Sequence, residues 1–371
     1  MSKRLPDAER ENPDWLSEPI PIGVGDVEDY AELPIKENGE PLVAIGPFAG
    51  NDYDRLLTDS LYAGERENSP YPPESLEGSL VTTFMREGTS ERIRQAEELL
   101  PEGYHVVVWD AFRTLEVQGS LYDFYRAKLA ELHPDWDDEQ LDAGTVPYVS
   151  KPSRDSKRPA THNTGGAVDL DIIRIPTEAE TRIQEIDRRI FEIGDSGDDW
   201  EEVYELERER QDIFTNQAEP LEFGAVRDYG DKQAAADYFE RLSETRSLTP
   251  EELEARDNRR MLYNVMERVG MQPLASEYWH YNDENTQMGS RVAGQAEASY
   301  GRAWLSKDNL THELMRRQHL SGAKVYAEDA VATELGDSEL DTLLKKVASE
   351  TAHPRQTTLP EAAVIQPEDV S

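Results

Sequence analysis

The sequence predicts an α+β fold: a small, mainly antiparallel sheet with flanking helices, a helical-hairpin insertion and a helical C-terminal extension. Two observations predict it. Short apolar or alternating stretches of strand length, such as residues 106–109 and 168–173, follow segments with helical periodicity or turn signals. The same helix-then-strand order recurs later, where a helical pattern leads into the extended stretch SEYWHYND at 276–283.

The individual elements follow from local start and stop signals. Residues 115–132 show the pattern of an amphipathic helix. Residues 168–173 alternate after Gly165-Gly166, which indicates a strand entered through a turn. The stretch 249–252, Thr-Pro-Glu-Glu, is a capping box with proline in the first turn, and it predicts a helix that Gly270 ends.

The chain divides into one main domain with an addition at each end. Residues 1–28 are rich in proline, glycine and acids and predict a loose N-terminal arm, and the main domain covers 29–301. Within it, isoleucines at helical spacing predict a charged helical hairpin at 177–216, inserted without chemistry of its own. Residues 302–352 predict a helical C-terminal extension, and 353–371, with three prolines, a disordered tail.

The charge of the chain is its most unusual bulk property. There are 77 acidic and 39 basic residues, for a formal net charge of −38. Such a surface repels nucleic acid and anionic membranes, so neither is expected as a partner. Because the acids are spread along the chain, we favour the hypothesis of a halophilic protein, in which concentrated salt screens the self-repulsion.

The lack of cysteine and of long apolar runs indicates in which cellular compartment the protein is expected. The chain has no cysteine, which excludes disulfides and thiolate metal ligands. The first residues contain no apolar segment of the kind that signal peptides carry, and no apolar run approaches the roughly 18 residues of a membrane helix. We therefore expect a soluble, cytoplasmic protein whose partner is a small molecule. A homo-oligomer is as compatible with the sequence as a monomer.

Two of the seven histidines, His162 and His280, lie in short stretches dense in acids and aromatics. Together with Asp169 they would offer two imidazole nitrogens and a carboxylate oxygen. That donor set suits a catalytic zinc ion, which keeps one position open for water. Glu277, three residues before His280, could take a proton from that water, and Arg113 could stabilise a developing oxyanion.

The spacing of Glu277 and His280 opposes this site if their strand is regular. Side chains three residues apart on a strand point to opposite faces, so both could face a metal only across a bulge or a tight turn. The residues themselves leave a second interpretation open. Gly165-Gly166 would then be a plain hairpin turn and Asp169 a polar residue at a strand end, with the neighbouring aromatics in the core.

Three short motifs occur in one order along the chain: VWDAFR at 108–113, HNTGGAVD at 162–169 and EYWHY at 277–281. They resemble the Y/W-D-A-Y-R-P, S-x-H-x-x-G-x-A-x-D and E-W/Y-W-H-Y/F motifs of the D-alanyl-D-alanine dipeptidases, the VanX type of zinc peptidase. The helical run-up to the third motif matches as well. The resemblance spans roughly residues 30–301, interrupted by the insertion.

The resemblance implies a zinc-dependent dipeptidase with one Zn²⁺ per chain, held by His162, Asp169 and His280. It implies that Glu277 acts as the catalytic base and then as the acid that protonates the leaving amine. Arg113 would steady the tetrahedral intermediate. The resemblance also implies that Glu277 and His280 both face the metal.

The substrate side of the resemblance contains departures. EFGAVRD at 222–228 resembles the family's D-M-G-T-x-F-D stretch, which implies that Asp228 binds the free ammonium group of a small D-Ala-D-Ala-type dipeptide. Tyr30 matches a substrate-side tyrosine. Ala160 stands where the family has serine, and Thr114 replaces the proline after the arginine. These departures leave the metal and base positions intact.

Three other functions are compatible with these residues. A cell-wall D,D-carboxypeptidase or endopeptidase would share the core but would normally need export. A non-haem iron oxygenase also uses two histidines and one carboxylate, but its first pair is usually spaced by two residues, not by seven. A non-catalytic binding module would need neither an open metal position nor Glu277 beside His280.

Overall fold

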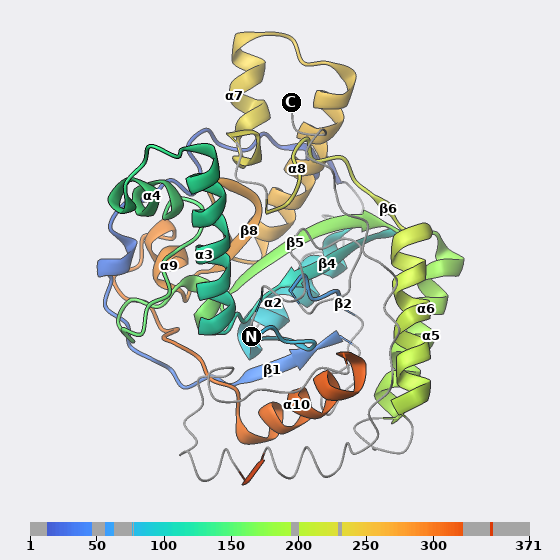
Figure 1. Ribbon diagram of the computed structural model, residues 1–371. Helices are drawn as coiled ribbons and strands as arrows, with labels where there is room; N and C mark the ends of the chain where they lie inside the picture. Colours follow the sequence, from blue (N-terminus) through green and yellow to red (C-terminus); the bar gives the residue numbers. More distant parts are fainter. Residues whose placement is uncertain are drawn as a thin grey trace.

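In the computed structural model, a six-stranded sheet organises the chain (Figure 1). Its strands follow the order β2-β4-β5-β8-β7, and the short β6 pairs with the end of β5. Among the described strands, β2 and β4 run parallel and the other pairs antiparallel, which confirms the predicted mainly antiparallel sheet. The strands of this sheet are β2 Leu57–Thr58, β4 Tyr104–Asp110, β5 Ala167–Arg174, β6 Glu219–Pro220, β7 Met271–Leu274 and β8 Glu277–Asp283.

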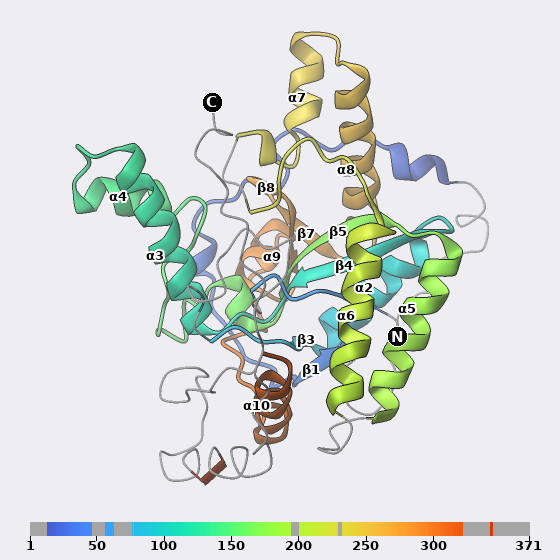
Figure 2. The same ribbon diagram turned by 45° about the vertical axis from the view of Figure 1, so that its right-hand side comes forward.

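Helices lie on both faces of the sheet (Figure 1 and Figure 2). One face packs against α2 and α8, and the other packs against α3, α5 and α6. A separate antiparallel pair is formed by β1 Leu42–Ile45 and β3 Thr83–Arg86. The α-helices are α2 Glu87–Leu99, α3 Leu115–Leu132, α4 Asp138–Thr145, α5 Thr177–Ile193, α6 Trp200–Asn216, α7 Tyr238–Thr245, α8 Pro250–Arg268, α9 Gln287–Val292 and α10 Lys307–Ser321. The 3₁₀ helices are η1 Pro13–Ser17, η2 Tyr30–Glu32, η5 Thr161–Thr164 and η6 Lys232–Ala234.

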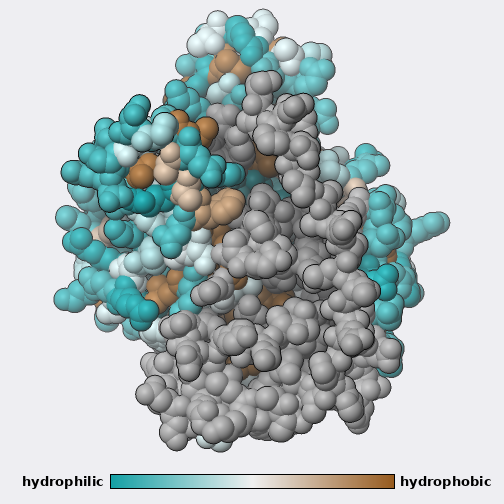
Figure 3. All heavy atoms as spheres, in the orientation of Figure 1, coloured by the Kyte–Doolittle hydropathy of each residue, from teal (hydrophilic) through white to brown (hydrophobic). Residues whose placement is uncertain are grey.

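The structure describes residues 13–46, 56–62, 76, 78–193, 200–228, 232–321 and 342–343. The predicted disordered tail, 353–371, and residues 1–12 of the predicted arm lie outside these ranges. Within them, no helix combines the length and the apolar character needed to cross a membrane. On the face shown in Figure 3, the visible described residues are mainly hydrophilic.

The alternation along β5 separates an apolar layer from the polar face of the sheet. Val168, Leu170 and Ile172 are fully buried in the core that β5 shares with α2 and α8. Burying a side chain of this size stabilises the fold by roughly 1.5–3 kcal/mol. Asp169 and Ile173 point to the opposite face, since side chains alternate along a strand. Ile173 packs there against α5 and α6, and Asp169 lies nearer the start of the strand.

Helices α5 and α6 occupy the predicted insertion at 177–216 and form a hairpin with arginine–glutamate ion pairs between its helices. Its inner side is fastened to the sheet. Arg210 is 1% exposed, donates to Asp187 at 2.7 Å and also donates to the carbonyl oxygen of Thr58 at 2.8 Å. The ion pair joins the two helices of the hairpin, and breaking such a buried pair costs about 3–5 kcal/mol. The bond to Thr58 of β2 connects the hairpin to the sheet.

The described part of the predicted loose arm, residues 13–28, packs against the protein instead. Leu16 and Ile20 are buried. The backbone N–H of Ile20 donates to Glu240 Oε1 at 3.2 Å, and η1 lies against α8. Two apolar residues thus hold this otherwise polar stretch against the protein. The prediction of a loose arm is therefore wrong for residues 13–28.

The predicted C-terminal extension is helical where the structure describes it. In α10, Leu310 and Leu314 are buried in a cluster with Leu42 and Phe84 of the two-stranded sheet. Glu313 accepts hydrogen bonds from two backbone N–H groups just before β3. Residues 322–341 and 344–352 of the extension lie outside the described ranges.

Candidate metal centre

Three neighbouring strands bring polar residues into one row. Asp110 at the end of β4 pairs with Asp169 on β5, and Asp169 pairs with His280 on β8. Directly opposed residues on adjacent strands point to the same face of a sheet, so these side chains lie side by side. The β4–β5 register shifts between Val108 and Asp110. This shift leaves Trp109 as a bulge and turns Asp110 toward the row.

His162 reaches the row from η5, the short helix before β5. Gly165 ends this helix with a φ of 72°, in the left-handed region. A Cβ atom at this position would lie 2.3 Å from Leu42 Cδ2. The backbone angle favours glycine, and any other residue would also have to displace the end of the Leu42 side chain. The turn folds His162 back over the start of β5, where it meets Asp169.

His162, Asp169 and His280 form a buried group whose candidate ligand atoms all lie within 4.8 Å of one another. His280 Nδ1 is 3.0 Å from His162 Nε2 and 2.9 Å from Asp169 Oδ1. His162 Nε2 is 3.4 Å from Asp169 Oδ2. Ligand atoms bound at about 2.0–2.1 Å to a tetrahedral zinc ion lie roughly 3.3 Å apart. The observed separations and the donor set therefore fit zinc.

The outer nitrogens of both imidazoles support the same conclusion. His162 Nδ1 lies 2.8 Å from the carbonyl oxygen of Ala111, and His280 Nε2 lies 3.2 Å from Asn282 Oδ1. Both oxygens are acceptors, so each outer nitrogen can carry the N–H and leave the inner nitrogen to bind a metal. Metal-binding histidines are typically oriented by such outer hydrogen bonds.

The electrostatics of the group also suit a cation. Burial opposes ionisation, but the charges of His162 and His280 and their hydrogen bonds hold the pKa of Asp169 well below its usual range. Burial lowers the pKa of His280, while its hydrogen bond to Asp169 and the charge of that residue outweigh burial and raise it. A divalent cation would compete with protons for these two side chains.

Glu277 lies beside the group because β8 is irregular. The β7–β8 register shifts, so that Leu274 pairs with Glu277 while Pro273 pairs with Tyr281. This irregularity removes the objection based on a regular strand, and Glu277 Oε2 lies 3.9 Å from His280 Nδ1. Burial raises the pKa of Glu277 to about 8, against the opposing charge of His280. A metal ion nearby would bring this pKa back toward neutrality.

Arg113 follows β4 and joins two acids of the row. Its Nη2 lies 2.7 Å from Asp110 Oδ2 and 3.2 Å from Asp169 Oδ2, and its side chain is 10% exposed. Thr114, which stands where the resembling family has proline, caps α3 and accepts a hydrogen bond from the backbone N–H of Val117. The cap keeps the strand-to-helix turn that directs Arg113 toward Asp169.

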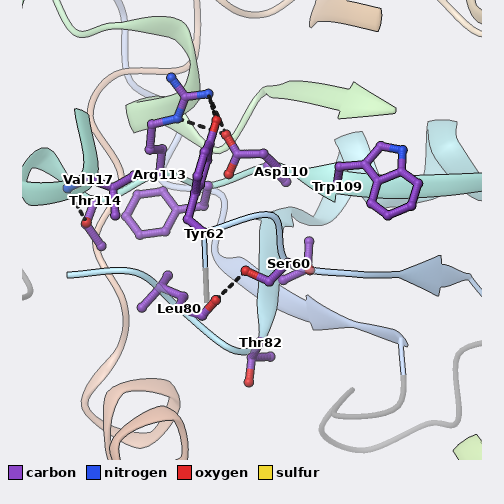
Figure 4. A pocket seen from close by; sticks show the side chains of 12 residues that line it. Ser60, Tyr62, Leu80, Thr82, Trp109, Asp110, Arg113, Thr114 and Val117 are labelled. Carbon is purple, nitrogen blue, oxygen red and sulfur yellow. Dashed lines mark hydrogen bonds and ion pairs between the residues drawn. The ribbon is translucent and has the colours of Figure 1, made fainter. Parts of the chain in front are cut away.

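A cavity of about 300 Å³ opens beside Arg113 (Figure 4). Figure 4 shows the Arg113 guanidinium directed toward the hydroxyl of Tyr62 and the carboxylate of Asp110. The described lining does not include His162, Asp169 or His280. The cavity therefore adjoins the candidate metal site on its Arg113 side.

Tyr62 and Asp228 extend the site on that side. Tyr62 Oη accepts from Arg113 Nη2 at 3.0 Å and donates to Asp228 Oδ2 at 3.3 Å. Burial, followed by the charge of Asp169, raises the pKa of Asp228 to about 7. The sequence had pointed to Asp228 but not to Tyr62, whose stretch SLYAGE carries no pattern of acids or metal ligands.

Tyr30, expected on the substrate side, lies in η2. It begins η2, which packs against α9, and Gln287 of α9 donates to the carbonyl oxygens of Ala31 and Leu33. No hydrogen bond or ion pair among the described residues joins Tyr30 to the candidate metal ligands. The tyrosine that contacts Arg113 is Tyr62.

Of the comparisons with known proteins, the one with solved structures found a slight likeness. No protein-family model and no curated protein matches the chain. Among solved structures, the chain is similar to a mutant of the vancomycin resistance D,D-pentapeptidase VanY from a VanB-type resistance cassette, in complex with Zn(II). The identity is 15%, the alignment covers 64% of this chain and 97% of that chain, and the TM-score is 0.25. A likeness of this size assigns no family, so the function must be inferred from the site itself.

Proposed function

We propose that the protein is a zinc-dependent peptidase that hydrolyses a small dipeptide of the D-Ala-D-Ala type. The position of Glu277 carries the proposal, since its carboxylate lies 3.9 Å from a nitrogen of the candidate ligand His280. A structural zinc site has four protein ligands and needs no base, whereas a hydrolytic site has three ligands and an open position. The group His162, Asp169 and His280 offers three, with Glu277 beside it.

Zinc, when bound, would supply a water of lowered pKa and polarise the scissile carbonyl. His162 and His280 would hold it as neutral imidazoles and Asp169 as a carboxylate. Glu277 would accept the proton of the water and return it to the leaving amine. The Glu277 carboxylate lies 3.9 Å from His280, which is longer than a hydrogen bond, so it is not hydrogen-bonded to that ring.

Arg113 is suited to stabilise the oxyanion that forms at the attacked carbonyl. Burial lowers its pKa, but the charges of Tyr62, Asp110 and Asp169 outweigh burial and keep the pKa well above its usual value. The guanidinium therefore stays charged throughout the working pH range. Loss of one donor to an oxyanion typically lowers kcat by about 10²–10³-fold.

Asp228 favours a substrate with a free ammonium group. A carboxyl group with a pKa of about 7 is easily converted to its charged form by an incoming cation. A cell-wall D,D-carboxypeptidase, the second candidate, would act on an acylated peptide that has no ammonium at this place. The pairing of Asp228 with Tyr62 beside Arg113 thus supports a dipeptidase.

The proposal is tested by offering D,D-, L,D- and L,L-dipeptides to the zinc-loaded protein in concentrated KCl and measuring released amino acid. We expect hydrolysis of the D,D-dipeptide, its loss with a chelator and its return with zinc. N-acetyl-D-Ala-D-Ala in parallel separates a dipeptidase from a carboxypeptidase. Protein that carries about one zinc ion per chain yet hydrolyses no peptide would refute the proposal.

A further inference from the structure

Arg227 ties the loop that ends at Asp228 to the sheet. Its Nη1 donates to Asp171 Oδ2 at 2.9 Å, and its guanidinium carbon lies 3.9 Å from the centre of the Trp109 ring. The side chains of Arg227 and Asp171 are 15% and 12% exposed. We call Arg227, Asp171 and Trp109 the arginine clamp. Partial burial strengthens both of its contacts, because water competes less for the charges.

Both partners of Arg227 are neighbours of site residues in the sequence. Asp171 follows Asp169 by two positions on β5 and therefore points to the same face. Trp109 directly precedes Asp110, and both residues line the cavity beside Arg113 (Figure 4). The clamp thus joins the loop to the two strands that carry a candidate metal ligand and the acid paired with Arg113.

The other anchors of this loop lie earlier in the chain. Arg259 donates to the carbonyl oxygen of Phe223 at 2.7 Å, and the Tyr278 hydroxyl donates to that of Ala225 at 3.3 Å. The next residue, Val226, is 70% exposed. Of these backbone and side-chain anchors of the loop, the arginine clamp is therefore the nearest to Asp228 in the sequence, and Tyr62 contacts the Asp228 carboxylate itself.

Asp228 itself adopts an uncommon backbone conformation, with a φ of 59°. A left-handed residue other than glycine costs roughly 1–2 kcal/mol and persists where its surroundings hold it. The contacts of Arg227 immediately before it, and of Tyr62 to its side chain, hold it here. A phenylalanine at position 227, as in the D-M-G-T-x-F-D motif, could not form the ion pair.

We propose that the arginine clamp selects substrates with a free amino terminus, because it holds the Asp228 carboxylate where the ammonium group of a dipeptide binds. The inference rests on the proposed peptidase function and adds to it a group of positioning residues. Arg227 and Asp171 act through Asp228 and touch no reacting atom. Their loss should therefore weaken binding of the free dipeptide and leave the chemical step intact.

The test compares wild type with Arg227→Met on D-Ala-D-Ala and on N-acetyl-D-Ala-D-Ala, the latter as substrate or as competing inhibitor. Methionine keeps an unbranched side chain over Trp109 but no charge. The KM for the free dipeptide should rise about tenfold with kcat little changed, as expected when one charged contact is lost. The KM or inhibition constant of the acetylated peptide should not change.

Further variants separate positioning from stability. Asp171→Asn should raise the KM for the free dipeptide as much as Arg227→Met does. The double variant should raise it no further, because each substitution removes the same ion pair. Arg174→Met is the matched control, since Arg174 lies over Tyr104 and pairs with Glu219 at the other end of β5. Zinc content and Tm are measured throughout. Arg227→Lys, which keeps the charge, should recover part of the affinity for the free dipeptide. If Arg227→Met does not fold, Arg227→Lys is compared with wild type in its place.

Four outcomes overturn the inference. An unchanged KM in Arg227→Met would do so. Equal losses on both peptides together with a lower Tm would reduce the clamp to a purely stabilising contact. Wild-type protein that hydrolyses both peptides with equal kcat/KM would remove the selection for a free amine and leave the peptidase proposal standing. Wild-type protein without activity on any dipeptide would remove the proposed function, and the inference with it.

Discussion

Glu277 Oε2 lies 3.9 Å from His280 Nδ1, although the two residues are three apart on one strand. A regular strand would direct them to opposite faces. The register shift between β7 and β8 brings them together, and Asp169 pairs with His280 from the other side. The irregularity in β8 thus places the Glu277 carboxylate beside the candidate metal ligands, at a distance from His280 that is too long for a hydrogen bond.

Glu277→Gln should keep bound zinc and lose turnover. Glutamine fills the same space but cannot accept the proton, and loss of a general base lowers kcat by about 10²–10⁴-fold. kcat and zinc content are measured on the same preparation. Glu219→Gln, at an exposed position on β6, is the control and should match wild type. An unchanged kcat in Glu277→Gln would exclude it as the base.

His162→Ala should abolish stoichiometric zinc binding. The variant loses a ligand whose ring is already oriented by Ala111, so the remaining two side chains hold the ion poorly. Zinc at 100 times its dissociation constant stabilises a protein by about 2.7 kcal/mol, so zinc should raise the Tm of wild type and not of the variant. His133→Ala, in which an exposed ring stacked on Trp136 is removed, is the matched control. Equal zinc content in His162→Ala and wild type would contradict the site.

Arg113→Lys should lower kcat by about 10²-fold with a much smaller effect on KM. Lysine keeps the charge but cannot reproduce the planar fork, which here reaches Asp110, Asp169 and Tyr62. Lysine is preferable to alanine, which would leave two buried carboxylates without a cation. Steady-state kinetics on the D,D-dipeptide provide the measurement. A change confined to KM would make Arg113 a residue of ground-state binding.

Much of the fold was predictable because its signals are local. The helix predicted at 115–132 has those bounds in the structure, and the capping box at 249–252 opens α8. The hairpin at 177–216 follows from isoleucines at helical spacing. In the arm, two isolated apolar residues are too weak a pattern to predict packing, although Leu16 and Ile20 are both buried.

The geometry of the site was less predictable because it depends on strand pairing. Motif residues identified His162, Asp169 and His280, and the structure brings them together. The row from Asp110 to His280, however, depends on a register set by residues distant in sequence and on the bulge at Trp109. Tyr62 enters through the parallel β2–β4 edge, to which no local pattern pointed.

The stability of the fold should depend on pH through His105. Burial lowers its pKa, but the hydrogen bond and charge of Glu97 and the charge of Glu180 outweigh burial, so the pKa is raised in the folded protein. Its contribution is therefore fully present below the unfolded value of about 6.5 and is lost as the pH rises through the raised folded value. Urea unfolding should show that the free energy of unfolding falls as the pH rises through this range. The fall should be smaller in His105→Gln than in wild type or in the control His133→Gln. Identical pH dependence in all three would contradict the coupling.

Concentrated KCl should raise the Tm. With a net charge of −38, self-repulsion acts across the whole surface, and 1 M salt shortens the screening length to about 3 Å. Ion pairs within the hairpin, such as Arg182–Glu209, are screened too, but exposed pairs contribute only about 0–1 kcal/mol each. The net effect of salt should therefore be stabilising. Sucrose controls for osmotic effects without screening, and a Tm that falls steadily with KCl would contradict adaptation to high salt.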